Sequence, residues 1–467
     1  MTAQTILPAN SASSGGFDVA NSVRLTGTND YFHKTPSSSG SRRLFSFSAW
    51  VKKADFSTGV LFSSGEADGN PNLALYFDSS SRINMYSTQG MQYITTRVFR
   101  DPHAWYHIMF VVGTASSNAN NRQQLYVNGV RETVFSTSTA IGQNTDLSIN
   151  TGDYRMSVGT GVDDQDYFGG YMAEVVFLDN QSLGPLSFGE FDEDSGIWKP
   201  IPIAGSAAVG GTNGFYLDFQ ASGNLGNDVF GGTDLTEVNV GALNQKTDTC
   251  TNNFCTLTPL TKLTDATFQA DLCRVTYGTA STRRAVFGSM VFTAGKWYCE
   301  TKITATSQTS VEMCLGISNT YNPEAIGNAL VSNNGFTVSL FPSNGSLYIG
   351  TTRDEQNLGN LAVNDIVGMA LDMDNGTLQF YKNGSALGSA NDITTGDSDD
   401  GELYPGFTIA NSCSSGGQTF TASHNFGSPA YSESGGNSDA DGFGNFSMSV
   451  PSGFFSICTK NLAEYGG

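Results

Sequence analysis

The sequence predicts an all-β protein built from two tandem antiparallel β-sandwiches. Hydrophobic residues alternate with polar ones in short runs that end in clusters of Gly, Asn, Ser and Asp, as in strands joined by tight turns. Gly accounts for 54 of the 467 residues, and charged residues for only 14%, against about 25% in an average protein. Almost no segment shows the period of an amphipathic helix. The 39% of hydrophobic residues, with 31 Phe and 18 Tyr, can build cores, so the chain is not disordered as a whole.

The expected strands follow one another along most of the chain. They are residues 44–52, 72–78, 82–87, 105–113, 124–132, 171–179, 296–303, 311–318, 335–341, 365–374 and 377–384. Asn-Gly pairs at 128–129, 375–376 and 383–384 supply the positive φ angles of type I′ hairpin turns. Residues 181–191 are the best candidate for a short helical turn.

Composition divides the chain into four parts. Residues 1–20 form an arm of small residues, and residues 21–195 form a strand-rich block. Residues 196–262 are a looser, Gly-rich bridging segment with isolated strands such as residues 214–220. Residues 263–467 form a second strand-rich block. Each block is long enough for one large sandwich.

The net charge of −20 excludes several classes of partner. Nucleic-acid binding and attraction to anionic membranes both depend on Lys and Arg, which this chain has in low number. No run approaches about 18 apolar residues, so we expect no membrane insertion. The N-terminus has no basic region followed by an apolar one, so we expect no signal peptide.

The cysteines indicate a reducing compartment. Their number is odd, and several lie in apolar runs that resemble strands, as expected for buried free thiols. They are Cys250, Cys255, Cys273, Cys299, Cys314, Cys413 and Cys458. Cys250 and Cys255 leave the alternatives of a disulfide or a metal site open, although no His or second cysteine pair is near them in sequence.

Three stretches of the first block form a recognisable set. They are FSFSAWVKK at 45–53, WYHIMFVVGT followed by RQQLYVNGVRE within 105–132, and YRMSVGTGVDDQDYFGGYMAEVVFLDNQSL at 154–183. Together they resemble the laminin-G-like, concanavalin-type jelly roll over nearly all of the block. The resemblance implies that Trp50 packs between the two sheets of the sandwich.

The second block has a motif set of its own. It contains GKWYCETKI at 295–303, MCLGISN at 313–319, NDIVGMALDMDNGTLQFYKNG at 364–384, ELYPGFTIAN at 402–411 and HNFGSPAY at 424–431. This set resembles the SPRY domain, which is also a bent β-sandwich. The predicted architecture is therefore two jelly-roll-like sandwiches joined by the bridging segment.

The combination of the two modules, with the stretches at 170–200 and 212–228, resembles structural proteins of marine tailed bacteriophages. This resemblance implies a virion protein made in the host cytoplasm. The first hypothesis is a tail or head fibre that binds the host receptor, a surface glycan or protein. The alternative is a purely structural capsid decoration or tail collar protein. In either case the arm at 1–20 would dock on other virion proteins. A fibre is usually trimeric, but no coiled-coil heptads support a homotrimer here.

An enzyme is the weakest hypothesis. Glucanases of the concanavalin-type fold place paired carboxylates on one strand. Glu174 and Asp179 lie an odd number of residues apart on their expected strand, so their side chains point to opposite faces of the sheet and do not converge. Glu174 is expected to hold a hydrogen bond at the sheet edge. His107, in an alternating strand, is expected to be structural. No Ser or Cys motif for nucleophilic catalysis is present.

The candidate ligand-binding residues are tyrosines of the expected loops. Tyrosine faces stack on sugar rings, and loops of Tyr, Asn, Ser and Gly suit adaptable recognition. The candidates are Tyr31, Tyr93, Tyr167, Tyr321 and Tyr348, and the alternative for each is ordinary packing. We expect no cofactor, with one open candidate for calcium: the loop that carries Asp163, Asp164 and Asp166, whose alternative is a solvated acidic loop.

Overall fold

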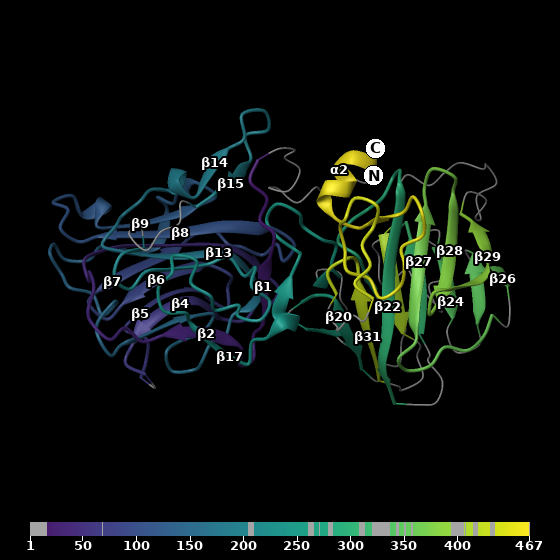
Figure 1. Cartoon of the computed structure of the whole chain (residues 1–467), viewed down its shortest axis with the longest axis horizontal. Helices are drawn as coiled ribbons and strands as arrows, with labels where there is room; N and C mark the ends of the chain where they lie inside the picture. Colours follow the sequence, from purple (N-terminus) through teal and green to yellow (C-terminus); the bar gives the residue numbers. More distant parts are fainter. Residues whose placement is uncertain are drawn as a thin grey trace. The chain divides into compact units, whose positions relative to one another are not determined.

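The computed structural model divides into two compact units, Pro8–Asn252 and a unit that contains Asn253–Gly467 (Figure 1). It describes residues 16–67, 69–203, 210–259, 266–269, 271–278, 284–307, 313–319, 337–341, 345–349, 352–355, 358–393, 406, 408–413, 419–429 and 435–466. Strands dominate these residues, and both units are antiparallel sandwiches, which confirms the predicted all-β class. None of the helices among the described residues has the length and hydropathy to cross a membrane.

Two eight-stranded sheets form the first unit. The first sheet contains, in spatial order, β10 (Val130–Arg131), β9 (Gln123–Val127), β8 (Trp105–Gly113), β3 (Leu44–Lys53), β13 (Gly169–Asp179), β1 (Ser22–Thr26) and β18 (Gln245–Lys246), and β16 (Phe215–Leu217) pairs with β13. The second sheet contains β11 (Phe135–Thr139), β7 (Met91–Thr95), β6 (Ile83–Ser87), β5 (Leu73–Phe77), β4 (Gly59–Gly65), β12 (Arg155–Val158), β2 (Tyr31–Lys34) and β17 (Thr236–Val238).

The core of the first unit lies between its two sheets. Strand β3 alternates, and it places Phe45, Phe47, Ala49 and Val51 into this core. Phe47 stacks on Phe62 of the opposite sheet with ring centroids 4.7 Å apart. The inward faces therefore interdigitate as in a β-sandwich.

The outer face of the first sheet is also buried. Trp50 has the opposite parity to the core residues of β3, and it packs with Trp105, Tyr171 and Trp198 in a separate cluster. The expectation that Trp50 packs between the sheets is therefore wrong. Trp198 belongs to a hairpin of β14 (Gly189–Phe191) and β15 (Trp198–Pro200), which follows η2 (Pro185–Ser187), the short helical turn expected within residues 181–191.

The expected bridging segment at 196–262 is not a separate part of the chain over most of its length, because its residues up to Asn252 belong to the first unit. Its strands are not isolated, because β16 pairs with β13, β17 with β2, and β18 with β1 after η3 (Ala242–Asn244). The end of the expected arm also joins this unit, since Val19 is buried and its N–H donates to Thr251 Oγ1 at 3.1 Å. Residues 1–15 lie outside the described residues.

The second unit is a sandwich of an eight-stranded and a six-stranded sheet. The first contains β19 (Ala266–Phe268), β20 (Arg274–Tyr277), β31 (Phe420–Asn425), β22 (Lys296–Thr306), β27 (Ile366–Asp372), β28 (Thr377–Lys382) and β29 (Ser385–Asp392), with β32 (Phe455–Ser456) parallel to β22. The other contains β21 (Arg284–Phe287), β30 (Thr408–Cys413), β23 (Met313–Ser318), β24 (Thr337–Phe341), β25 (Ser346–Ile349) and β26 (Thr352–Glu355). Helix α2 (Thr459–Tyr465) follows β32.

The C-terminal residues of the second unit cover the outer face of β22. Phe446 is fully buried, and its ring meets that of Tyr298 at 5.1 Å. The fully buried Glu300 accepts the backbone N–H groups of Ser447 and Met448 at 3.0 and 2.9 Å. Residues after the predicted last strands are therefore an integral part of this sandwich.

Two of the three predicted Asn-Gly turns have the expected conformation. Asn128 and Gly129 have φ angles of 49° and 75°, and Asn383 and Gly384 have 49° and 87°. At the third pair only Gly376 is in the left-handed region, so the prediction of type I′ is wrong there. A Cβ at Gly129 would overlap the Trp198 ring, so this turn also needs glycine for close packing.

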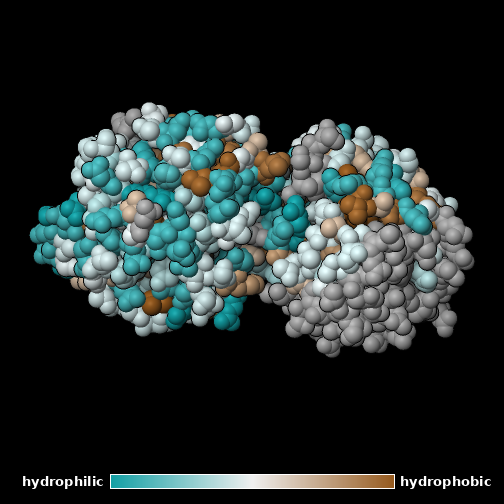
Figure 2. Space-filling model, turned by 90° about the horizontal axis from the view of Figure 1, so that it is seen from below, coloured by the Kyte–Doolittle hydropathy of each residue, from teal (hydrophilic) through white to brown (hydrophobic). Residues whose placement is uncertain are grey.

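The described surface in Figure 2 is mostly hydrophilic or of intermediate hydropathy, with small groups of apolar residues. The most exposed large apolar side chains include Leu186, Val134 and Val130. Scattered residues of this kind are normal on a protein surface. Apolar exposure therefore does not by itself locate a functional site.

Six of the seven cysteines, Cys250, Cys255, Cys273, Cys299, Cys314 and Cys458, are free and buried. This confirms the expectation of buried thiols for these six. The side chain of Cys413 lies outside the described part.

Candidate functional site

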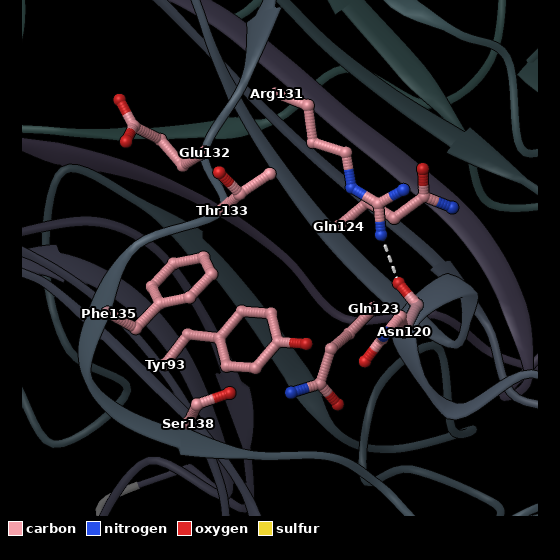
Figure 3. A pocket seen from close by; sticks show the side chains of 9 residues that line it. All are labelled: Tyr93, Asn120, Gln123, Gln124, Arg131, Glu132, Thr133, Phe135 and Ser138. Carbon is pink, nitrogen blue, oxygen red and sulfur yellow. Dashed lines mark hydrogen bonds between the residues drawn. The ribbon is translucent and has the colours of Figure 1, made fainter.

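A pocket of about 250 Å³ opens on the first unit (Figure 3). It lies where edge strand β11 and its neighbour β7 meet η1 (Ala119–Asn121) and the β9–β10 hairpin. Its lining residues are Tyr93, Asn120, Gln123, Gln124, Arg131, Glu132, Thr133, Phe135 and Ser138. Of the five predicted tyrosines, the structure thus places Tyr93 in a pocket.

Two aromatic rings form the apolar wall of the pocket. The Tyr93 and Phe135 rings stack with centroids 4.2 Å apart and an interplanar angle of 23°. Register explains the contact, because Phe135 lies opposite Thr95 and therefore diagonal to Tyr93 on the same face. Tyr93 is only 6% exposed, whereas Phe135 is half-buried. Phe135 is therefore the ring more open to a ligand.

Two amides of the lining hold the pocket in shape. Gln123 donates from Nε2 to the Thr139 carbonyl and accepts the Ile141 N–H at Oε1, both at 2.8 Å. Gln124 Oε1 accepts the Tyr126 hydroxyl at 2.6 Å. These side chains are committed to the protein, so ligand recognition falls to the remaining polar groups.

Those groups include hydroxyls, the exposed Asn120 side chain and one guanidinium. Thr133 and Ser138 are exposed, and the Tyr93 hydroxyl points towards Gln123 in Figure 3. Burial raises the pKa of Tyr93, and this outweighs the lowering by the Arg131 charge and by hydrogen bonds, so the phenol is neutral at pH 7. A neutral phenol can both donate and accept a hydrogen bond.

Arg131 supplies the positive charge of the pocket. Its guanidinium donates to the Asn120 carbonyl and, at 3.4 Å, to Asn121 Oδ1. The neighbouring Glu132 carboxylate turns away in Figure 3 and pairs with Arg97 at 3.1 Å. The pocket therefore combines an aromatic face, hydroxyls and a cation. This set suits the binding of a ligand that has both an apolar face and polar groups.

Tyr31 and Tyr167 come together at a different place. Their ring centroids are 6.0 Å apart, and the Arg155 guanidinium lies over the Tyr31 ring at 4.8 Å. Tyr31 is on β2, which is five strands from β7 in the second sheet, or about 24 Å at about 4.8 Å per strand. This cluster is therefore separate from the Tyr93 pocket.

The last two tyrosines do not join either group. Tyr348 lies half-buried on β25 of the second unit, opposite Ser339 and Arg353. Tyr321 lies outside the described residues. The five predicted tyrosines therefore do not form one site.

The acidic loop beside Tyr167 does not bring its three carboxylates into one group. Asp164 Oδ1 pairs with Arg155 Nη2 at 2.6 Å instead of turning to Asp163 and Asp166. Among the described residues, which include all three, no group of three or more His, Cys, Asp or Glu side chains is arranged to hold a metal ion. Calcium binding at this loop stays a prediction.

The other residues considered for catalysis have structural partners. Glu174 is not at a sheet edge as expected. It lies at a bulge of the interior strand β13, where it is 3% exposed and accepts the Tyr216 hydroxyl at 2.5 Å. Burial raises the pKa of Glu174 to about 7. Asp179 instead accepts the Ser41 N–H at 2.7 Å. His107 is fully buried and lies 2.8 Å from Ser48 Oγ.

Sequence reasoning missed most of the pocket. Arg131 follows the predicted Asn-Gly turn, so hairpin pairing places it opposite Tyr126 on β9, beside Gln124. That signal was readable from the sequence. Phe135 was not, because β11 has no alternating hydrophobic pattern and residues 135–139 were not expected to form a strand.

Family models match one segment in each unit. Residues 26–183 match the model of the concanavalin A-like lectin/glucanases superfamily, of the laminin-G type. Residues 296–421 match the model of the SPRY domain. No curated protein matches the chain.

Solved structures with similar parts include three proteins. The SPRY domain of human HERC1 is 16% identical, with 32% of this chain and 86% of that chain covered and a TM-score of 0.25. A putative carbohydrate binding protein from Bacteroides ovatus is 15% identical, with 50% and 61% covered and a TM-score of 0.36. A heptameric SAP-like pentraxin from Limulus polyphemus is 13% identical, with 36% and 80% covered and a TM-score of 0.27.

The two segments expected from sequence resemblance are thus matched by family models, each within one compact unit. The first unit therefore contains a segment similar to concanavalin A-like, laminin-G-type domains, and the second unit a segment similar to SPRY domains.

Proposed function

We propose that the chain is a non-enzymatic binding protein whose first unit recognises a saccharide in the pocket beside Tyr93. The observation that carries the proposal is the half-buried Phe135 ring, stacked on Tyr93, next to exposed hydroxyl groups. A sugar ring has an apolar face and a rim of hydroxyls. A pocket with an aromatic wall and a few placed polar groups is complementary to both.

Two further points support binding over catalysis. The family model matched by the first unit includes lectins as well as glucanases. Glu174 and Asp179, the two carboxylates considered for glycosidase chemistry, bond to different protein groups, and neither lines the pocket. A glycosidase needs two carboxyl groups facing one sugar bond.

We further propose that the chain is a bacteriophage virion protein, namely a tail or head fibre component that binds a host surface glycan. Its support is the resemblance of residues 170–200 and 212–228 to phage structural proteins. A capsid decoration or collar protein is the second candidate, favoured by the same resemblance. Mass spectrometry of virions tests both, because a fibre is present in few copies and a decoration protein in hundreds.

The saccharide proposal is tested with the full chain on a glycan array. The Phe135→Ser variant removes the aromatic wall, and Tyr86→Ser is its control, because Tyr86 is an exposed aromatic residue of the same sheet outside the pocket. We expect the chain and Tyr86→Ser to bind the same saccharides and Phe135→Ser to lose them. Absence of any saccharide binding, or equal binding by both variants with unchanged thermal unfolding, would overturn the proposal.

A further inference from the structure

The charge at the pocket narrows the class of saccharide. We infer that the ligand carries a carboxylate, as a uronic acid does, and that Arg131 binds this group; the inference rests on the proposed saccharide function. The chain has a net charge of −20, so an arginine in the pocket that forms no ion pair with a carboxylate of the described residues contrasts with the charge of the rest of the protein.

The bonding of Arg131 leaves donors for a ligand. A guanidinium has five N–H donors. Two hydrogen bonds, to the Asn120 carbonyl and to Asn121 Oδ1, tie it to η1. Both acceptors are neutral, and no carboxylate of the described residues forms an ion pair with Arg131. The guanidinium is thus anchored in position while its charge stays available.

The acidic neighbour does not cancel this charge. Glu132 follows Arg131 in sequence, but its carboxylate turns away in Figure 3 and pairs with Arg97 at 3.1 Å. The Glu132 side chain is 15% exposed and that of Arg97 48%, so the carboxylate is the more shielded partner of the pair. Arg97 therefore serves to keep the pocket cationic.

The other lining groups fit an acidic sugar rather than a simple anion. Phe135 offers a face for the sugar ring, and the exposed hydroxyls of Thr133 and Ser138 can bond to sugar hydroxyls. Arginine binds carboxylates through two parallel N–H groups, a geometry that lysine lacks. A uronic acid residue carries all three complementary features: a carboxylate, a sugar ring and hydroxyls.

The inference is tested with a matched pair of probes, cellobiouronic acid and cellobiose, which differ in a carboxylate and a hydroxymethyl group. We expect the full chain to bind the acidic probe at least about tenfold more tightly, since a charge-assisted pair contributes that much. Higher salt should reduce this difference. Arg131→Gln should abolish this difference, while Arg131→Lys should retain part of it.

Arg43→Gln is the control, because it removes the same charge from an exposed pair with Asp146 outside the pocket. It should behave as the unmodified chain does. Equal affinity for both probes, or an acidic preference that survives in Arg131→Gln, would overturn the inference while the saccharide function stands. If neither probe nor any saccharide of the array binds, the proposed function itself fails.

Discussion

The buried ion pair between Lys52 and Asp248 predicts that residues after β17 stabilise the first unit. Lys52 Nζ lies 2.7 Å from Asp248 Oδ2, and the two side chains are 0% and 1% exposed. Asp248 Oδ1 also accepts the Trp105 indole N–H at 3.1 Å. The replacement Asp248→Ala leaves a buried ammonium without its carboxylate and an indole N–H without this acceptor.

The expected loss is large because a buried charge loses its counter-ion. Removing one partner of a buried pair costs about 3–5 kcal/mol. At about 2–4 °C per kcal/mol for a unit of this size, Tm falls by about 6–20 °C. Tryptophan fluorescence reports mainly the unfolding of the first unit, because Trp50, Trp105 and Trp198 lie in that unit and only Trp297 in the second. It therefore measures this fall in Tm selectively.

Two variants make the reasoning refutable. Replacing both partners, Lys52→Met with Asp248→Leu, should restore much of the stability, since no buried charge remains. Asp146→Asn, in the exposed pair with Arg43, should leave Tm unchanged. A small effect of Asp248→Ala, or a double variant as unstable as the single one, would show that this pair does not hold the segment to the sandwich.

Three further predictions concern other parts of the fold. Burial raises the pKa of Glu174 from 4.5 to about 7, so this carboxyl group loses its proton at lower pH in the unfolded state than in the folded one. The stability of the first unit should therefore fall as pH rises from about 4.5 to about 7. Urea unfolding at several pH values measures this dependence, and Glu174→Gln should flatten it. Phe446→Ala should destabilise the second unit by about 3–5 kcal/mol, because Phe446 is fully buried against β22. Calorimetry should show this loss while the unfolding transition of the first unit stays at the same temperature. EDTA should leave the Tm of the first unit unchanged, since Asp164 already pairs with Arg155, and a rise in Tm on adding calcium would instead support a metal site at this loop.

Much of the fold could be predicted because its signals are local. Strands such as β8 and β3 show regular alternation, and the Asn-Gly turn at Asn128 has one favoured conformation. The segment from 196 to 252 could not be assigned in this way. Its short strands pair with β13, β2 and β1, which are distant in sequence, and their composition resembles that of a linker.

The candidate site was predictable only in part. Tyr93 could be named from its residue type, but so could four other tyrosines, and residue type does not tell a pocket from ordinary packing. Trp50 illustrates the same limit, because its strand has two buried faces and alternation alone does not say which face the indole occupies. The partner Phe135 depends on a bulged pairing between β11 and β7, which is a tertiary feature.

A crystal structure of the full chain with cellobiouronic acid is the most direct test of the central claim. We expect the sugar ring to lie against Phe135 in the Tyr93 pocket, with its carboxylate on the Arg131 guanidinium. A saccharide bound at another place on the first unit, or a pocket that stays empty at concentrations at which binding in solution is saturated, would contradict the account.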